Sequence, residues 1–231
     1  VMAEAFEGFP PDTVKFLAQL ARNNDRAWFQ ANKQRYERSV RGPAIAFIEA
    51  MAGPLEKVSR HIYADPSPVG GSLMRIHRDI RFSRNKTPYK TNIGIQFRHE
   101  LAKDVHAPGF HVHIATDACF LAVGCWHPEP DALGKIRDRV AQKPERWFAA
   151  RDAKAFVDHW QLDGESLKRP PRGYDLTHPA IEDIKRKDFV AVAPLSFNEV
   201  IGPGLIKLAS QRFAETAPFM AFLCEALGVP Y

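Results

Sequence analysis

Hydrophobic residues in the first sixty positions recur every three or four residues, the spacing that places side chains on one face of an α-helix. One such stripe occupies residues 12–22, and it follows a proline, which favours a helix start. A second begins after Asp25, a residue type that caps helices, and a third covers residues 43–59. Together these patterns predict a helical N-terminal layer.

The middle of the chain changes to short runs that are rich in β-branched and aromatic residues, with Gly, Pro, Asn or Asp between them. Four such runs, at residues 72–82, 93–98, 110–116 and 118–126, predict a meander of about four strands. The connection around Asp117 is short enough for a hairpin, so neighbouring strands are expected to be antiparallel.

Helical spacing returns in the second half of the chain, over residues 132–142, 144–160 and 180–187. A further strand is predicted at residues 188–195. After it the chain ends in helices that a Gly-Pro-Gly sequence at residues 202–204 interrupts.

The order of these patterns predicts an α+β fold. In this fold a mainly antiparallel sheet of about four to six strands packs against the N-terminal helical layer and the C-terminal helices. The chain has no internal repeat and no long flexible linker. We therefore expect residues 1–231 to form a single domain.

Charge is concentrated in one stretch, RIHRDIRFSRNKTPYK at residues 75–90, here called the cationic segment. It holds six of the 32 lysines and arginines and one of the 27 acidic residues, so the rest of the chain has 26 of each. The whole formal net charge of +5 thus comes from this segment. Nucleic acids and membranes normally require a broader basic surface, and we expect a local site for an anion instead.

Other features of the composition exclude several classes of protein. No apolar run approaches the ~18 residues of a membrane-spanning helix, and the start of the chain lacks the pattern of a secretory signal. We therefore expect a cytoplasmic protein with no membrane contact. Cys119, Cys125 and Cys224 form no CxxC pair and are expected to be buried apolar residues. The sequence leaves cofactors and the oligomeric state open.

The cationic segment also contains an ordered set of side chains. They are Arg75, Arg78-Asp79, Arg81-Phe82, Asn85-Lys86 and Tyr89. This order resembles the signature of a bacterial family catalogued as domain of unknown function 2461. Residues 23–37 and 167–189 look similar to the same family, so the resemblance covers most of the chain. The family has no established activity, and the resemblance implies a fold and a site without implying a reaction.

If residues 75–82 are extended, their side chains alternate between two faces. One face is then polar, with Arg75, His77, Asp79 and Arg81. The other buries aliphatic and aromatic groups, and its residues are Ile76, Arg78, Ile80 and Phe82. Arginine offers a planar fork of N–H donors that fits a phosphate or a carboxylate. Three arginines around one acid leave cationic capacity for an external anion.

We therefore expect a cationic cleft that binds a small phosphorylated or carboxylated ligand. In this hypothesis Arg78, Arg81 and Lys86 hold the anion, Asp79 orients the arginines and Tyr89 donates a hydrogen bond. Within the segment the expected site residues are Arg75, Arg78, Asp79, Arg81, Lys86, Tyr89 and Lys90.

A second cationic loop, residues 168–174, adds Arg172 and Tyr174 to the expected site. Its prolines restrict the backbone, and Gly173 permits a turn that aims both side chains at the same cleft. A solvated connection is the alternative, because charged, proline-rich loops usually have that role. The family resemblance over this loop favours the cleft.

Two other interpretations of the basic residues stay open. In one, they form a surface for nucleic acid or a protein partner, which extends over residues 168–172 and 185–187. In the other, the arginines of the cationic segment form a structural network with acids of the N-terminal helices, such as Asp25, Glu37 or Glu49. No nucleophile with an adjacent base stands out, so the sequence does not decide whether the chain catalyses a reaction.

Histidines in the predicted sheet are candidates for a metal site. His111 and His113 are two residues apart on a predicted strand and share a face, and His77 or Asp79 would be the third ligand. The spacing matches no common zinc motif, and histidines on strands commonly make ordinary hydrogen bonds. We therefore expect no metal, and the sequence does not decide whether His77, His111 and His113 converge.

Overall fold

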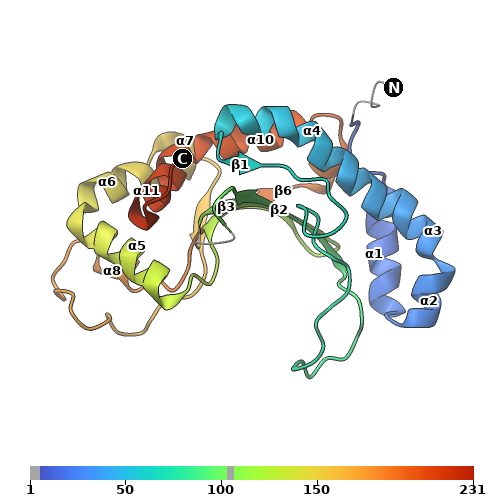
Figure 1. Cartoon of the computed structure of the whole chain (residues 1–231), viewed down its shortest axis with the longest axis horizontal. Coiled ribbons are helices and arrows are strands. Elements are labelled where there is room, and N and C mark those ends of the chain that lie inside the picture. The colour runs from blue at the N-terminus through green and yellow to red at the C-terminus, as the bar shows by residue number, and fades with distance from the viewer. Residues whose placement is uncertain (1–5, 103–106) are drawn as a thin grey trace.

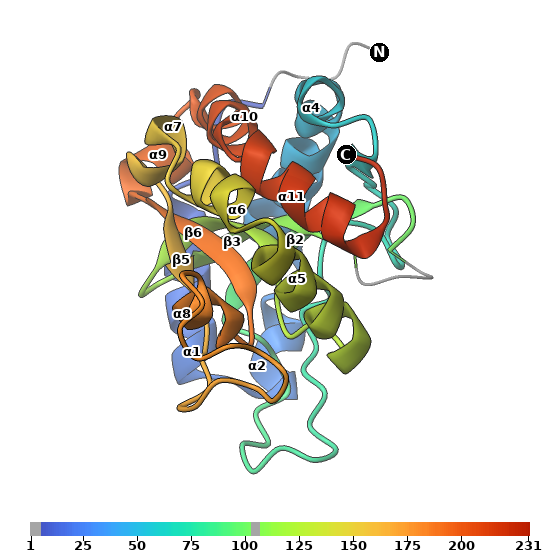
Figure 2. The ribbon, with the colours of Figure 1, turned by 90° about the vertical axis from the view of Figure 1, so that its left-hand side faces the viewer.

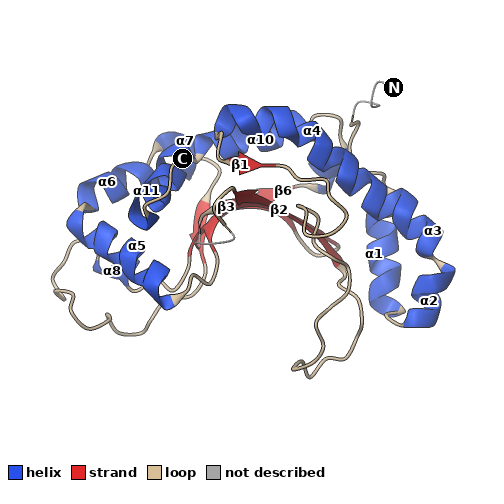
Figure 3. Cartoon of the chain, viewed as in Figure 1, coloured by secondary structure: helices blue, strands red, loops and turns tan. Residues whose placement is uncertain are grey.

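The computed structural model describes residues 6–102 and 107–231, and it places helices around a curved sheet (Figures 1 and 3). Residues 1–5 lie outside the described residues. The expectation that the start of the chain is not a secretory signal falls partly on them. Within these residues the sheet has six strands in the order β1-β2-β3-β4-β6-β5, and neighbouring strands are antiparallel. The strands are β1 (Ile62–Tyr63), β2 (Asn92–His99), β3 (Gly109–Ala115), β4 (Cys119–Cys125), β5 (Gln161–Asp163) and β6 (Phe189–Leu195).

Helices occupy both ends of the chain. In Figure 1, α1 to α3 stand at one end of the sheet and α5, α6 and α8 at the other, while α4 and α10 lie across it. The N-terminal group is α1 (Asp12–Arg22), α2 (Arg26–Ala31), α3 (Lys33–Tyr36), the π-helix η1 (Glu37–Arg41) and α4 (Gly42–Val58). The later helices are α5 (Pro130–Gln142), α6 (Pro144–Arg151), α7 (Lys154–Val157), α8 (Ile181–Ile184), α9 (Phe197–Ile201), α10 (Leu205–Glu215) and α11 (Ala217–Leu227).

The convex face of the sheet forms the centre of the hydrophobic core. Because side chains alternate along a strand, Phe97, Phe110 and Leu121 all lie fully buried on this face. Helix α10 lies against them, and its Phe213 stacks on Phe110 with ring centroids 4.4 Å apart. Figures 1 and 2 show α4, α10 and α11 along the same side of the sheet. Among the described residues, no helix covers the opposite, concave face (Figure 1).

Small residues hollow the concave face. Gly109, Ala122 and Gly124 lie there, on two adjacent strands. At Gly94 on β2, an added Cβ would lie 2.7 Å from Sδ of Met74 and 3.4 Å from the ring of His111. Glycine at this position lets both of those side chains pass over the strand.

Most predicted elements are present close to their predicted bounds. The strands predicted at residues 93–98, 110–116, 118–126 and 188–195 correspond to β2, β3, β4 and β6. The prediction of an α+β fold with helices at both ends is confirmed. The three cysteines are buried and carry free thiols, as expected.

The strand predicted at residues 72–82 is wrong. Only isolated bridges occur there, between Leu73 and Ile95 and between His77 and Tyr89, and Figure 3 draws the segment as loop. The predicted alternation requires a buried face, but Phe82 is 95% exposed. Its first residues bond to β2 and the rest to residues 88–90, but without a hydrophobic layer over Phe82 they form no continuous strand.

The single helix predicted at residues 144–160 is also wrong, because the chain bends after α6. This bend brings Trp147 and Phe156 to the same partner, Phe219, at centroid distances of 5.7 and 5.1 Å. Tertiary packing thus overrides local helical propensity. Strands β1 and β5 were not predicted, because two and three residues are too few to show an alternating pattern.

One cluster of buried apolar residues extends from Phe9 to Leu223 through all the layers of the described structure. This continuous core supports the expectation of a single domain. The single domain itself stays a prediction. Among the described residues, no helix has the length and apolar character needed to cross a membrane.

We predict that Phe213→Ala lowers the free energy of unfolding by about 3–5 kcal/mol, because it leaves a cavity beside Phe97 and Phe110. Urea unfolding followed by circular dichroism measures the change. Phe197→Ala removes the same ring from a site that is 38% exposed, and it should cost less than about 1.5 kcal/mol. Equal losses in the two variants would contradict this account of the core.

Candidate functional site

A hollow of about 520 Å³, here called the cationic pocket, lies between the start of α4 and the loop that leads into the cationic segment. Four basic side chains reach it, and no acidic side chain is among the described residues that line it. The basic residues are Arg41, Arg75, Lys90 and Arg98. The pocket therefore has a strong excess of positive charge.

The π-helical turn η1 places Tyr36 and Arg41 at one wall of the pocket. In this turn Gly42 donates its backbone N–H to the carbonyl oxygen of Glu37, and a Cβ at Gly42 would lie only 2.8 Å from that oxygen. Arg41 Nη1 also donates to Glu37 Oε2, over 3.2 Å. Burial raises the pKa of Tyr36 to about 12, so its hydroxyl keeps its proton at neutral pH.

A tight loop over residues 65–72 forms the opposite wall. The backbone N–H of Ser72 donates to the carbonyl oxygen of Asp65 over 2.7 Å. A Cβ at Gly71 would lie 2.3 Å from the carbonyl oxygen of Ser67, so the loop requires glycine there. The carbonyl oxygen of Gly70 accepts a hydrogen bond of 3.2 Å from Arg98 Nη1, and this bond holds the guanidinium beside the pocket.

Arg75 and Lys90 supply positive charge that has no ion-pair partner among the described residues. Burial lowers the pKa of Lys90, and the nearby guanidinium of Arg75 lowers it further. The carboxylate of Asp79 also interacts with Arg75 over a longer range, but it forms its ion pair with Arg81. An anion between Arg75 and Lys90 would relieve the repulsion between them.

Beyond Arg75, the cationic segment projects away from the sheet as a loop whose two sides pair with each other (Figures 1 and 3). Its basic side chains form hydrogen bonds within the loop. Arg78 Nη1 donates to Thr87 Oγ1 over 2.6 Å, Lys86 Nζ donates to the carbonyl oxygen of Ile80 over 2.9 Å, and Arg81 Nη2 pairs with Asp79 Oδ2 over 2.6 Å.

Tyr89 anchors the base of this loop. Its ring stacks on Phe29 of α2 with centroids 4.1 Å apart, and it is 3% exposed. The side chain of Asn24 bonds to both backbone groups of Tyr89, at 2.9 and 3.0 Å. Tyr89 therefore holds the cationic segment against the N-terminal helices and does not line the pocket.

The second cationic loop lies at the other end of the molecule. Tyr174 Oη donates to Asp138 Oδ1 of α5 over 2.7 Å, and burial with this bond raises the pKa of Tyr174 to about 12. Arg172 is exposed. Neither residue lines the cationic pocket.

The structural network between the cationic segment and acids of the N-terminal helices does not form among the described residues. Asp25 accepts the backbone N–H of Trp28 and caps α2, and Glu37 pairs with Arg41. The arginines of the segment bond to Thr87 and Asp79 instead. Among the described residues, the carboxylates of those helices therefore do not neutralise the segment's arginines, and Arg81 pairs with Asp79 of its own loop.

Of the expected site residues, the structure thus brings Arg75 and Lys90 into one pocket and places Arg78, Asp79, Arg81, Lys86, Tyr89, Arg172 and Tyr174 outside its lining. Sequence analysis missed Arg41 and Arg98. Alternation along β2 would have placed Arg98 on the polar face of the sheet, but the sequence carries no comparable signal for Arg41.

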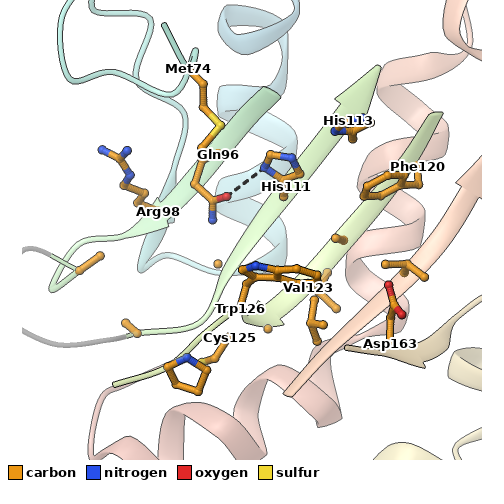
Figure 4. A pocket seen from close by; sticks show the side chains of 18 residues that line it. Met74, Gln96, Arg98, His111, His113, Phe120, Val123, Cys125, Trp126 and Asp163 are labelled. Carbon is orange, nitrogen blue, oxygen red and sulfur yellow. Dashed lines mark hydrogen bonds between the residues drawn. The ribbon is translucent and has the colours of Figure 1, made fainter. Parts of the chain in front are cut away.

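A second hollow of about 590 Å³, here called the groove, lies on the concave face of the sheet. Figure 4 shows Gln96 and His111 near its middle, with the rings of Phe120 and Trp126 beside them. Met74 and Arg98 line the groove and the cationic pocket alike, and the two hollows therefore share a wall. Sequence analysis did not predict this groove.

His111 is held in one tautomer on the floor of the groove. Its Nδ1 lies 3.0 Å from Gln96 Oε1, and because an amide oxygen only accepts, Nδ1 carries the proton and Nε2 is an acceptor. Burial, with smaller effects of His113 and Lys90, lowers the pKa of His111 to about 4. The ring of His113 stacks on Phe120, with centroids 4.6 Å apart.

The three histidines considered for a metal do not form one cluster. The rings of His111 and His113 are 6.2 Å apart, whereas His77 packs against Phe29 and Tyr89. Among the described residues, no three His, Cys, Asp or Glu side chains are arranged to hold a metal ion.

A buried carboxylate fixes the rim of the groove. Asp188 accepts the backbone N–H groups of His127 and Glu165, at 2.8 and 3.0 Å. His127 has a positive φ of 47°, an unusual conformation for this residue that the bond to Asp188 maintains. The neighbouring Trp126 and Asp163 are thereby held at the edge of the groove.

The fold and the two hollows define an α+β protein with an open concave sheet beside a cationic pocket. The family described as "Conserved hypothetical protein (DUF2461)" matches residues 12–222, and the chain belongs to this family. The resemblance seen in the sequence is confirmed. No curated protein and no solved structure matches the chain.

We predict that His111 makes the folded protein less stable in acid. Its pKa falls from 6.5 to about 4 on folding, so below pH 6.5 the unfolded chain binds a proton that the folded chain does not. Stability should therefore fall between pH 6.5 and 4, by about 3 kcal/mol from this group.

Urea unfolding at pH 7 and pH 4 measures this loss, and His111→Gln should lack it. Phe120→Leu is the control, because it disturbs the groove without removing the titrating group. The same pH dependence in the wild type and in His111→Gln would contradict the prediction.

Proposed function

We propose that the protein binds a small phosphorylated or carboxylated compound and that the cationic pocket holds the anionic group. The observation that carries the proposal is the lining of the pocket: four basic residues, and no acidic one among the described residues. Charge-assisted hydrogen bonds from arginine and lysine are among the strongest that proteins offer to oxyanions.

The four cations differ in how strongly the protein already engages them. Arg41 forms an ion pair with Glu37, and Arg98 donates a hydrogen bond to the carbonyl oxygen of Gly70. Arg75 and Lys90 have no such partner among the described residues, so they contribute most to binding. Tyr36, which keeps its hydroxyl proton, adds a neutral donor.

A single small anion fits this geometry better than a nucleic acid. The pocket has a volume of about 520 Å³, within the range of small-molecule sites. The broad basic surface that a polyanion requires would include Lys185 and Lys187, but these pair with Glu182 and Glu165. The described residues of the pocket support binding of an anion, and no nucleophile stands beside a base among them, so no reaction is proposed.

We predict that Arg75→Gln and Lys90→Gln each weaken the binding of inorganic phosphate by about tenfold, because each removes one charge-assisted hydrogen bond. A titration followed by NMR of the ¹⁵N-labelled protein gives the dissociation constants. Acetate in a parallel titration shows whether the pocket prefers phosphate or carboxylate.

Arg84→Gln is the matched control, because it removes the same charge from the exposed part of the cationic segment, outside the pocket. It should leave phosphate binding within about twofold of the wild type. Equal weakening by Arg75→Gln and Arg84→Gln, or binding of mixed-sequence DNA that both variants weaken, would overturn the proposal in favour of a general basic surface.

A further inference from the structure

We propose that the groove binds the flat apolar part of the same small molecule whose anionic group the cationic pocket holds. The ligand class is then a ring compound, aromatic or similarly flat, that carries one phosphate or carboxylate. This inference rests on the proposed function and assigns the kind of ligand to it.

The two hollows adjoin at Met74 and Arg98, and a ligand would pass over these side chains to reach from one to the other. Both side chains line the groove and the cationic pocket. In Figure 4 both lie on the side of His111 that faces away from Phe120. The positive charge of Lys90 in the cationic pocket also contributes to the lowered pKa of His111 on the groove floor, after burial and His113. The two residues are therefore near enough to interact electrostatically. One molecule can therefore reach both.

Small residues alternate with larger ones on the floor of the groove. In the row of paired residues that crosses the sheet, Gln96, His111, Ala122 and Val192 are neighbours, and Gly109 and Gly124 lie beside them. Its volume of about 590 Å³ is in the range of small-molecule sites. A hollow of this size has room for a planar ring beside His111.

Trp126 provides a ring surface at the edge of this floor. It is 58% exposed, although large aromatic side chains are more stable when covered. Figure 4 shows its indole within the groove, on the same side of the sheet as His111. Stacking against a ligand ring would cover the apolar surface of Trp126.

The charged side chains among the described lining residues favour one direction of the ligand. Arg98 lies at one end and the carboxylate of Asp163 at the other (Figure 4). An anionic group is attracted to the Arg98 end and repelled from the Asp163 end. Between them, the Nε2 atom of His111 accepts a hydrogen bond from a hydroxyl or amino group on the ring.

The experiment compares 1-naphthyl phosphate with inorganic phosphate, and 1-naphthoate with acetate, by calorimetric titration of the full chain. Each naphthyl compound should bind at least about tenfold more tightly than the anion alone, because its ring is removed from water. The phosphate and carboxylate pairs identify which anion the site prefers. Trp126 fluorescence should change only with the naphthyl compounds.

Ala122→Phe is the principal variant, because Ala122 pairs with His111 and its side chain shares the groove face. The added ring should abolish the advantage of 1-naphthyl phosphate and leave the affinity for inorganic phosphate within about twofold. Ala122→Ser keeps the volume of the groove and is the matched control. If Ala122→Phe does not fold, Trp126→Ala at the exposed rim makes the same comparison and should reduce the advantage.

The outcomes separate the two proposals. Inorganic phosphate that binds and is weakened by Arg75→Gln, with no gain from the naphthyl ring, would overturn the groove inference and leave the proposed function standing. A naphthyl advantage that survives both groove variants would also overturn the inference. Failure of the proposed function would appear as the absence of any binding that Arg75→Gln weakens.

Discussion

Burial of one face of the sheet is the constraint on which the rest of the structure depends. Rings such as Phe97 and Phe110 pack against Phe213 and the surrounding helices, and each contributes about 1.5–3 kcal/mol when fully buried. Since side chains alternate along a strand, the same packing commits Gln96 and His111 to the opposite face. The groove therefore follows from the core, because a shift in register by one residue would exchange the two faces.

This dependence explains how far the sequence predicts the structure. Alternation over residues 93–98 and 110–116 identifies strands correctly because each has a paired neighbour and a helix to cover one face. Residues 72–82 show the same alternation, but the chain offers no layer to cover Phe82. A period-two pattern predicts a strand only where tertiary packing supplies the buried face, and that information is not local.

The candidate site shows the same limit. The local excess of charge pointed to Arg75 and Lys90, which line the cationic pocket. It pointed equally to Arg78 and Arg81, which bond within their own loop instead. The other two basic residues of the pocket, Arg41 and Arg98, come from other elements of the fold. Arg41 reaches the pocket through a π-helical turn, which no spacing in the sequence predicts.

Electrostatic interactions connect the cationic pocket with the groove through Lys90 and His111. Burial lowers the pKa of His111 most, and His113 and then Lys90 lower it further, while burial and then Arg75 lower the pKa of Lys90. Positive charge in the pocket therefore helps to keep His111 neutral, with Nε2 as an acceptor. By linkage, an anion bound beside Lys90 favours the protonated form of His111, and a neutral His111 is maintained chiefly by its own burial. Burial of the concave floor and charge in the pocket thus act on the same imidazole, which lies at the middle of the groove.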